Sequence, residues 1–84
     1  MTPSEQQYFE SLFHTFSTDG WRAFIEDMQS NFDALNHVQN ISDAKELHFK
    51  QGQLNALSAI LNFETSIRNA HDDAEAMMQG DSDA

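Results

Sequence analysis

The stretch of sequence that decides the fold is residues 19–39, DGWRAFIEDMQSNFDALNHVQ. Its apolar residues recur every three or four positions over about five turns, as one face of a helix requires. They are Trp21, Phe24, Ile25, Met28, Phe32, Leu35 and Val38. Thr18 precedes them as an N-cap, and Asp19 lies in the first turn, where the helix dipole favours a carboxylate. The pattern predicts a helix over residues 19–39.

A shorter helix is predicted before this one, over residues 3–16. Thr2, Pro3 and Glu5 form a capping box with proline at the first helical position, where its missing N–H costs nothing. One apolar stripe follows, made of Tyr8, Phe9, Leu12, Phe13 and Phe16. Their spacing of three and four residues is typical of a helix.

A third and longest helix is predicted after a turn at residues 40–42, with Ser42 as its N-cap. Two adjacent apolar stripes run along it: Leu47, Leu54, Leu57 and Leu61 form one, and Phe49, Ala56, Ile60, Phe63 and Ile67 form the other. A helix with such a broad apolar face contacts two neighbours. Gly52 lies inside this pattern, at a cost of about 1 kcal/mol relative to alanine. We therefore expect Gly52 where another helix approaches closely.

These signals predict an all-α fold: a three-helix unit in which the short first helix packs on a long antiparallel hairpin of the second and third. Residues 1–70 are predicted to form a single helical domain, and residues 71–84 an acidic, partly frayed C-terminal extension. The first helix is too short to cover the hairpin. Part of the apolar surface therefore stays exposed in a monomer, which indicates a partner.

The charge balance narrows the choice of partner. Fourteen Asp and Glu against four Lys and Arg give a formal net charge of −10 over 84 residues. Such a surface repels phosphate backbones and anionic membranes, so neither direct nucleic-acid binding nor membrane binding is expected. A basic protein is favoured electrostatically. The N-terminal sequence lacks a signal-peptide pattern, so we expect a protein that is not secreted.

Sequence motifs that indicate catalysis or metal binding are missing from the sequence. It has no cysteine, and no two of its four histidines are three or four residues apart. We therefore predict no catalytic residue, no cofactor and no metal, and a protein that is not an enzyme. Glu64 is expected to pair with Arg68 four residues on. The segment His71-Asp72-Asp73 is interpreted as part of a solvated tail.

The candidate partner-binding residues are Trp21, Glu26, Asp27, Asp33, Glu46, Phe49 and Lys50. Tryptophan is enriched at binding hot spots, although Trp21 equally suits closure of one end of the core. The four acids carry the electrostatic argument. Lys45 and Lys50 flank two apolar residues, where they either offset neighbouring acids or meet an acidic partner.

Two segments resemble small acidic helical proteins of tailed bacteriophages, particularly short-tailed ones. They are residues 13–27, FHTFSTDGWRAFIED, and residues 46–54, ELHFKQGQL. The resemblance implies a viral accessory or virion-associated protein, located in the host cytoplasm or the virion. It implies no role for any individual residue.

Two hypotheses follow. In the first, the chain is a non-catalytic protein–protein interaction protein, either virion-associated or an assembly component. Its apolar face docks onto copies of itself, as a homo-oligomer, or onto a phage structural protein. In the second, it is an acidic phage inhibitor of a basic host protein, acting as a nucleic-acid mimic or a plug on a host defence or transcription enzyme. The second predicts a carboxylate-rich face on the second and third helices.

Overall fold

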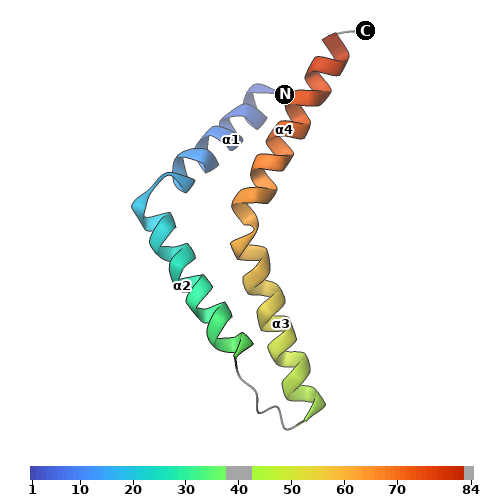
Figure 1. The fold of residues 1–84 in the computed structure, drawn as a ribbon. Helices are drawn as coiled ribbons and strands as arrows, with labels where there is room; N and C mark the ends of the chain where they lie inside the picture. Colours follow the sequence, from blue (N-terminus) through green and yellow to red (C-terminus); the bar gives the residue numbers. More distant parts are fainter. Residues whose placement is uncertain (38–42, 83–84) are drawn as a thin grey trace.

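The computed structural model describes residues 1–37 and 43–82 of the chain. All regular secondary structure in this part is helical, so the all-α class is confirmed (Figure 1). The helices are α1 (Pro3–Phe16), α2 (Asp19–Asn36), α3 (Ala44–Leu61) and α4 (Phe63–Ser82). The predicted number of helices is wrong, because the described part of the chain contains four helices where the sequence predicts three.

The helices begin where local side chains satisfy their first N–H groups. The Thr2 hydroxyl accepts a hydrogen bond from the Glu5 N–H at 3.1 Å, and the Thr18 hydroxyl accepts one from the Trp21 N–H at 3.1 Å. Both caps are as predicted. The predicted third cap and the predicted turn lie outside the described residues. The cap of α3 is instead Asp43, whose Oδ1 accepts from the Glu46 N–H at 2.7 Å.

The predicted long third helix is divided at Asn62. The Asn62 N–H still donates to the Ser58 carbonyl at 3.0 Å, and the Asn62 carbonyl accepts from the Ser66 N–H at 2.9 Å. Asn62 itself has φ −94° and ψ 0°, in the bridge region between the helical and extended conformations. These two bonds connect α3 and α4 through Asn62, where the chain bends, and the bend lets α4 pack against α1 (Figure 1).

The molecule consists of two bent helical arms that run antiparallel. α2 packs along α3, while α1 packs against α4 and the start of α2 (Figure 1). The first helix thus packs on α4, which lies within the predicted third helix. The result is elongated, with extents of 59 × 31 × 17 Å. Its radius of gyration is 18.0 Å, against about 12 Å for a compact domain of this length.

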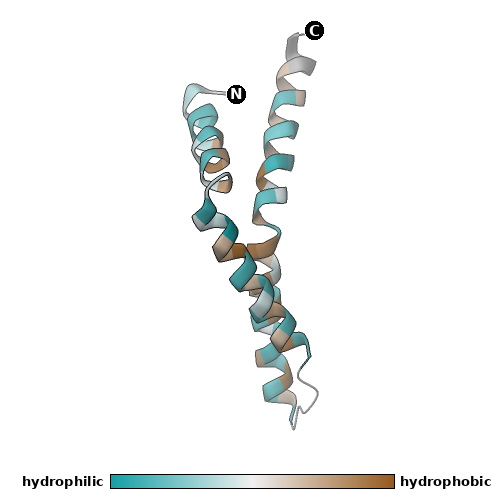
Figure 2. Ribbon diagram, turned by 60° about the vertical axis from the view of Figure 1, so that its left-hand side comes forward, coloured by the Kyte–Doolittle hydropathy of each residue, from teal (hydrophilic) through white to brown (hydrophobic). Residues whose placement is uncertain are grey.

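The core is small and lies at the junction of α1, α2 and α4. Phe9, Phe16 and Ile67 are buried, and Met1, Leu12, Phe13 and Trp21 pack against them. Apolar residues also gather at the bend, where α2 meets the junction of α3 and α4 (Figure 2). No side chain in the described part is completely buried. A chain with so thin an interior keeps much of its apolar surface on the outside.

Two sequence-based expectations change in this structure. An added Cβ at Gly52 would meet nothing within 4 Å, so the prediction of a close helix approach there is wrong. α4 also passes residue 70 without a break, although the division of the chain into residues 1–70 and 71–84 stays a prediction. No described helix is both long and apolar enough to cross a membrane.

Candidate protein-binding surface

An apolar groove opens at the centre of the molecule, where three helices meet. Its walls are Trp21 and Phe24 of α2, Ala59 and Ile60 of α3, and Phe63 of α4, which together we call the central groove. The groove encloses about 350 Å³. Phe24 is 42% exposed and Phe63 is 37% exposed. Two aromatic rings thus present their apolar surface to solvent at the middle of the chain.

Aromatic packing holds the walls of the central groove in place. The Trp21 ring lies 5.0 Å from Phe16 of the core, 5.8 Å from Phe24 and 6.3 Å from Phe63, measured between ring centroids. Phe16 and Phe63 are themselves 5.9 Å apart in an edge-to-face arrangement. Trp21 therefore closes the core on one side and forms a wall of the groove on the other, which combines both roles considered for it.

A polar network backs this aromatic cluster. The Trp21 indole Nε1 donates to Glu64 Oε1 at 3.2 Å, and Arg68 Nε donates to Glu64 Oε2 at 3.0 Å, so the predicted Glu64–Arg68 pair is confirmed. The Arg68 guanidinium lies 5.2 Å from the Phe13 ring centroid, within cation–π range. Arg68 is about 140° around α4 from Phe63. Arg68 thus lies on the side of α4 away from the groove, while Glu64 contacts the groove wall through Trp21.

A second concavity continues the surface along the α2–α3 hairpin. We call it the hairpin groove; it encloses about 520 Å³ and is lined by Asn31, Ala34, Leu35, Gln53, Ala56 and Leu57. Ala56 and Ile60 are four residues apart, so both grooves share one side of α3. Phe24 and Leu35 are eleven residues apart, which is close to three full turns, so both grooves also share one side of α2.

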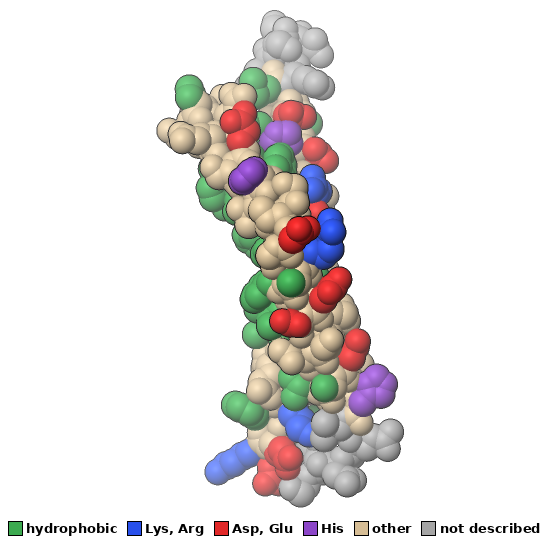
Figure 3. Space-filling view, turned by 90° about the vertical axis from the view of Figure 1, so that its left-hand side faces the viewer, with side chains coloured by type: hydrophobic (Ala, Val, Ile, Leu, Met, Phe, Trp, Pro, Cys, Tyr) green, Lys and Arg blue, Asp and Glu red, His purple; other side chains and the backbone are tan. Residues whose placement is uncertain are grey.

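The same side of the molecule carries exposed apolar residues toward both ends. Phe49 is 68% exposed and lies eleven residues from Ile60, on the same side of α3. Met77 is 73% exposed and lies fourteen residues from Phe63, on the same side of α4. We call the two grooves together with Phe49 and Met77 the apolar edge. Figure 3 shows hydrophobic side chains along one long edge of the molecule, with most of the visible acidic side chains away from it.

The predicted acidic residues do not gather on one surface. Glu26 and Asp33 are exposed and lie about 200° and 180° around α2 from Phe24, on the side opposite the central groove. Asp27 is only about 60° from Phe24 and borders the groove. Glu46 is half-buried in the first turn of α3. The four carboxylates proposed for one face therefore divide between separate surfaces.

The predicted cation Lys50 is half-buried on α3, next in sequence to Phe49. Lys45, which is exposed, lies four residues before Phe49 and so projects from the same side of the helix. Between its ends α3 carries Glu46 as its single acid, with these two lysines. Its formal charge of about +1 contrasts with the net charge of −10 of the whole chain.

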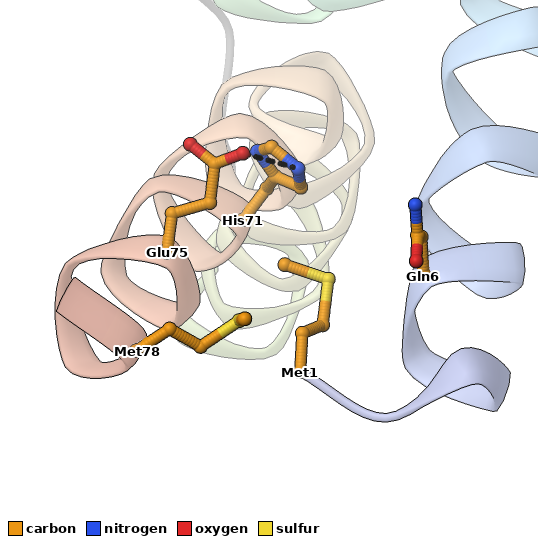
Figure 4. Close-up of a pocket in the computed structure, with 5 residues that line it drawn as sticks. All are labelled: Met1, Gln6, His71, Glu75 and Met78. Carbon is orange, nitrogen blue, oxygen red and sulfur yellow. Dashed lines mark ion pairs between the residues drawn. The ribbon is translucent and has the colours of Figure 1, made fainter. Parts of the chain in front are cut away.

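A pocket between α1 and α4 surrounds His71 (Figure 4). It encloses about 340 Å³ and is lined by Met1, Gln6, His71, Glu75 and Met78. The imidazole packs edge-on against Phe9 and Phe13, with both ring centroids 5.1 Å away. His71 therefore fastens α4 to α1 and does not belong to a solvated tail. Its position four residues after the buried Ile67 is the sequence signal that indicates this role.

His71, Asp72 and Glu75 bring one possible ligand atom each within 4.8 Å of one another. His71 Nδ1 lies 3.7 Å from Asp72 Oδ1, and His71 Nε2 lies 3.4 Å from Glu75 Oε1. Because each carboxylate faces a different ring nitrogen, the geometry suits ion pairing better than shared coordination of one ion. Exposed acidic groups such as these are common without a metal.

The described surface offers apolar contact area backed by a cluster of packed aromatic rings. Behind the central groove, the Trp21 indole and the Arg68 guanidinium both donate to Glu64. The chemistry of this arrangement is that of binding to another apolar surface. No protein-family model, no curated protein sequence and no solved structure significantly matches the chain.

Proposed function

We propose that this chain is a non-catalytic protein-interaction component that docks its apolar edge onto another protein surface, as part of a phage particle or of its assembly. The observation that carries the proposal is the excess of exposed surface. The chain exposes 6394 Å², whereas a compact monomer of 9.6 kDa exposes about 5,100 Å². The difference of about 1,300 Å² exceeds the roughly 800 Å² that each partner contributes to a standard protein–protein interface.

The composition of the apolar edge supports the same proposal. Protein interfaces are enriched in aromatic residues and methionine and are depleted of charge at their centre. Trp21, Phe24 and Phe63 form the centre of this edge, with Phe49 and Met77 toward its ends. An apolar surface of this length on a soluble monomer marks an interaction site.

The phage setting follows from the resemblance of residues 13–27 and 46–54 to small acidic phage proteins, and the geometry adds the docking surface. In this setting the chain acts in the host cytoplasm during assembly, or remains in the virion. Its partner is either another copy of the chain or a phage structural protein.

The test uses particles purified from a culture infected with a virus that carries the gene. Wild-type chain, Phe49→Ser and the matched control His48→Ser are each supplied with the same tag, and the chain is quantified in the particles and in intermediates of assembly. Both side chains are exposed and adjacent on α3, but His48 lies about 100° further around the helix. We expect the wild type and His48→Ser to associate equally, and Phe49→Ser several-fold less. Absence of the wild-type chain from particles and from all assembly intermediates would overturn the proposal.

The inhibitor hypothesis is favoured by one separate observation. Asp19, Glu26 and Asp33 follow one another at seven-residue intervals along α2, about 10 Å apart, on the side opposite the central groove. A row of carboxylates suits a basic groove on a host protein, and such binding weakens steeply as salt is raised. Replacing Glu26 and Asp33 by Gln and Asn is expected to abolish capture of a basic host protein. Unchanged capture by this double variant would remove the hypothesis.

A further inference from the structure

We infer that the occupant of the apolar edge is a second copy of this chain, packed antiparallel about a two-fold axis that passes through the central groove. The inference rests on the proposed interaction function and names the partner. The dimer requires three properties of the edge. It must be large enough for a stable interface, and low enough in charge for two acidic chains to meet. Its two ends must also carry opposite charges, so that each end fits the other end of the partner.

The excess of exposed surface of the whole chain is large enough to meet the first requirement. If each chain buries its excess of about 1,300 Å², the dimer buries about 2,600 Å² in total, within the range of obligate homodimers. The buried residues of the single chain are few, namely Phe9, Phe16 and Ile67 among those described. A second copy supplies the interior that a single elongated chain lacks.

The charge distribution meets the second requirement. Glu26 and Asp33 lie on the side of α2 opposite the central groove, and the Glu64 carboxylate is paired with Arg68 and with the Trp21 indole. Asp27 is the acid that borders the groove on α2. Two chains of net charge −10 can therefore touch along the edge while most of their acids remain in solvent.

The two ends of the edge meet the third requirement. Toward one end Lys45 lies four residues from Phe49 on α3, and toward the other Asp73 lies four residues from Met77 on α4. The midpoints of these two pairs, at residues 47 and 75, are equally far from residue 61, beside the central groove. At about 1.5 Å per residue each pair lies about 21 Å from this centre.

A two-fold axis at the centre therefore brings the Lys45–Phe49 end of each chain to the Asp73–Met77 end of its partner. Residues equally far from residue 61 then meet, so Lys45 lies opposite the partner's Met77 and Phe49 lies opposite the partner's Asp73. Lys45 and the partner's Asp73 are about four residues, or about 6 Å, apart along the axis, within reach of the long lysine side chain. A parallel arrangement would instead set aspartate against aspartate and lysine against lysine. The antiparallel dimer is thus the arrangement that the charges favour.

The experiment measures dimer dissociation of the full-length chain by sedimentation equilibrium at about 0.1 M salt, where surface charges still interact. The variants are Lys45→Glu, Asp73→Lys, the two combined, and the control Asp72→Lys. Asp72 is an adjacent acid that faces His71, about 140° around α4 from Met77. Its substitution changes the net charge as much as Asp73→Lys does.

We expect the wild-type chain to be a dimer. Each edge substitution should raise the dissociation constant about tenfold, because every pair occurs twice in the dimer. The combined variant should return the constant to within about threefold of wild type. Asp72→Lys is expected to leave the constant within about threefold of wild type. A dimer that the combined variant fails to restore overturns the antiparallel arrangement. A wild-type chain that stays monomeric at about 1 mM overturns the inference altogether, while particle association in the earlier experiment would still support the proposed function.

Discussion

Replacing Phe16 by alanine is expected to detach α1 from the rest of the molecule. Phe16 is 8% exposed, and its ring lies within 6.4 Å of the rings of Phe13, Trp21 and Phe63, so it joins α1, α2 and α4. Truncation of a buried phenylalanine costs about 3–5 kcal/mol. Small domains have a total stability of only about 5 kcal/mol or somewhat more, so this loss removes most of it.

The assay is urea unfolding followed by tryptophan fluorescence, at two protein concentrations about a hundredfold apart. Phe49→Ala is the matched variant, because the same side chain is removed from a surface position that is 68% exposed. Phe16→Ala should lower the unfolding midpoint at both concentrations. Phe49→Ala should weaken the dimer. The unfolding midpoint should therefore fall at the higher concentration and become nearly independent of protein concentration.

If the alanine variant does not fold, Phe16→Leu provides a milder change whose stability can still be measured. It should lower the free energy of unfolding by about 1 kcal/mol. Equal losses from Phe16→Ala and Phe49→Ala at the lower concentration would refute the reasoning, because they would place both rings in equivalent surroundings.

Two further predictions concern single positions. Trp21→Phe removes the indole N–H that donates to Glu64. Because that carboxylate is partly exposed, we expect the free energy of unfolding to fall by about 1 kcal/mol. An unchanged stability in thermal or urea unfolding would show that the hydrogen bond does not contribute. Gly52→Ala should stabilise α3 by about 1 kcal/mol at low protein concentration, since an added Cβ meets nothing within 4 Å. A loss of stability in this variant would reveal a close backbone neighbour at Gly52.

Much of the fold could be predicted from local signals in the sequence. The caps at Thr2 and Thr18 and the bounds of α1 depend on side chains within four residues of one another, and the structure confirms them. The break at Asn62 depends instead on distant contacts: α4 bends toward α1 so that Phe63 can reach Phe16. Asparagine inside a helix costs well under 1 kcal/mol, so the local signal for a break is weak.

The candidate surface was predictable only in part, for a similar reason. The second apolar stripe of the third predicted helix is visible in the sequence; its members Phe49 and Phe63 remain exposed, whereas Ile67 is buried in the core. The separation of Asp27 from Glu26 and Asp33 could also be worked out from helical periodicity. The two grooves could not, because they require the relative rotation of α2 and α3, which no local pattern specifies.

If the apolar edge is buried between two copies of the chain, as we infer, the molecular mass in solution is that of a dimer. Light scattering at about 0.1 M and about 1 M salt tests it most directly, because the higher salt screens surface charge without weakening apolar contact. We expect a mass of twice 9.6 kDa at both salts, with a tighter dimer at the higher salt, where repulsion between two chains of net charge −10 is screened. A monomer at both salts would contradict it.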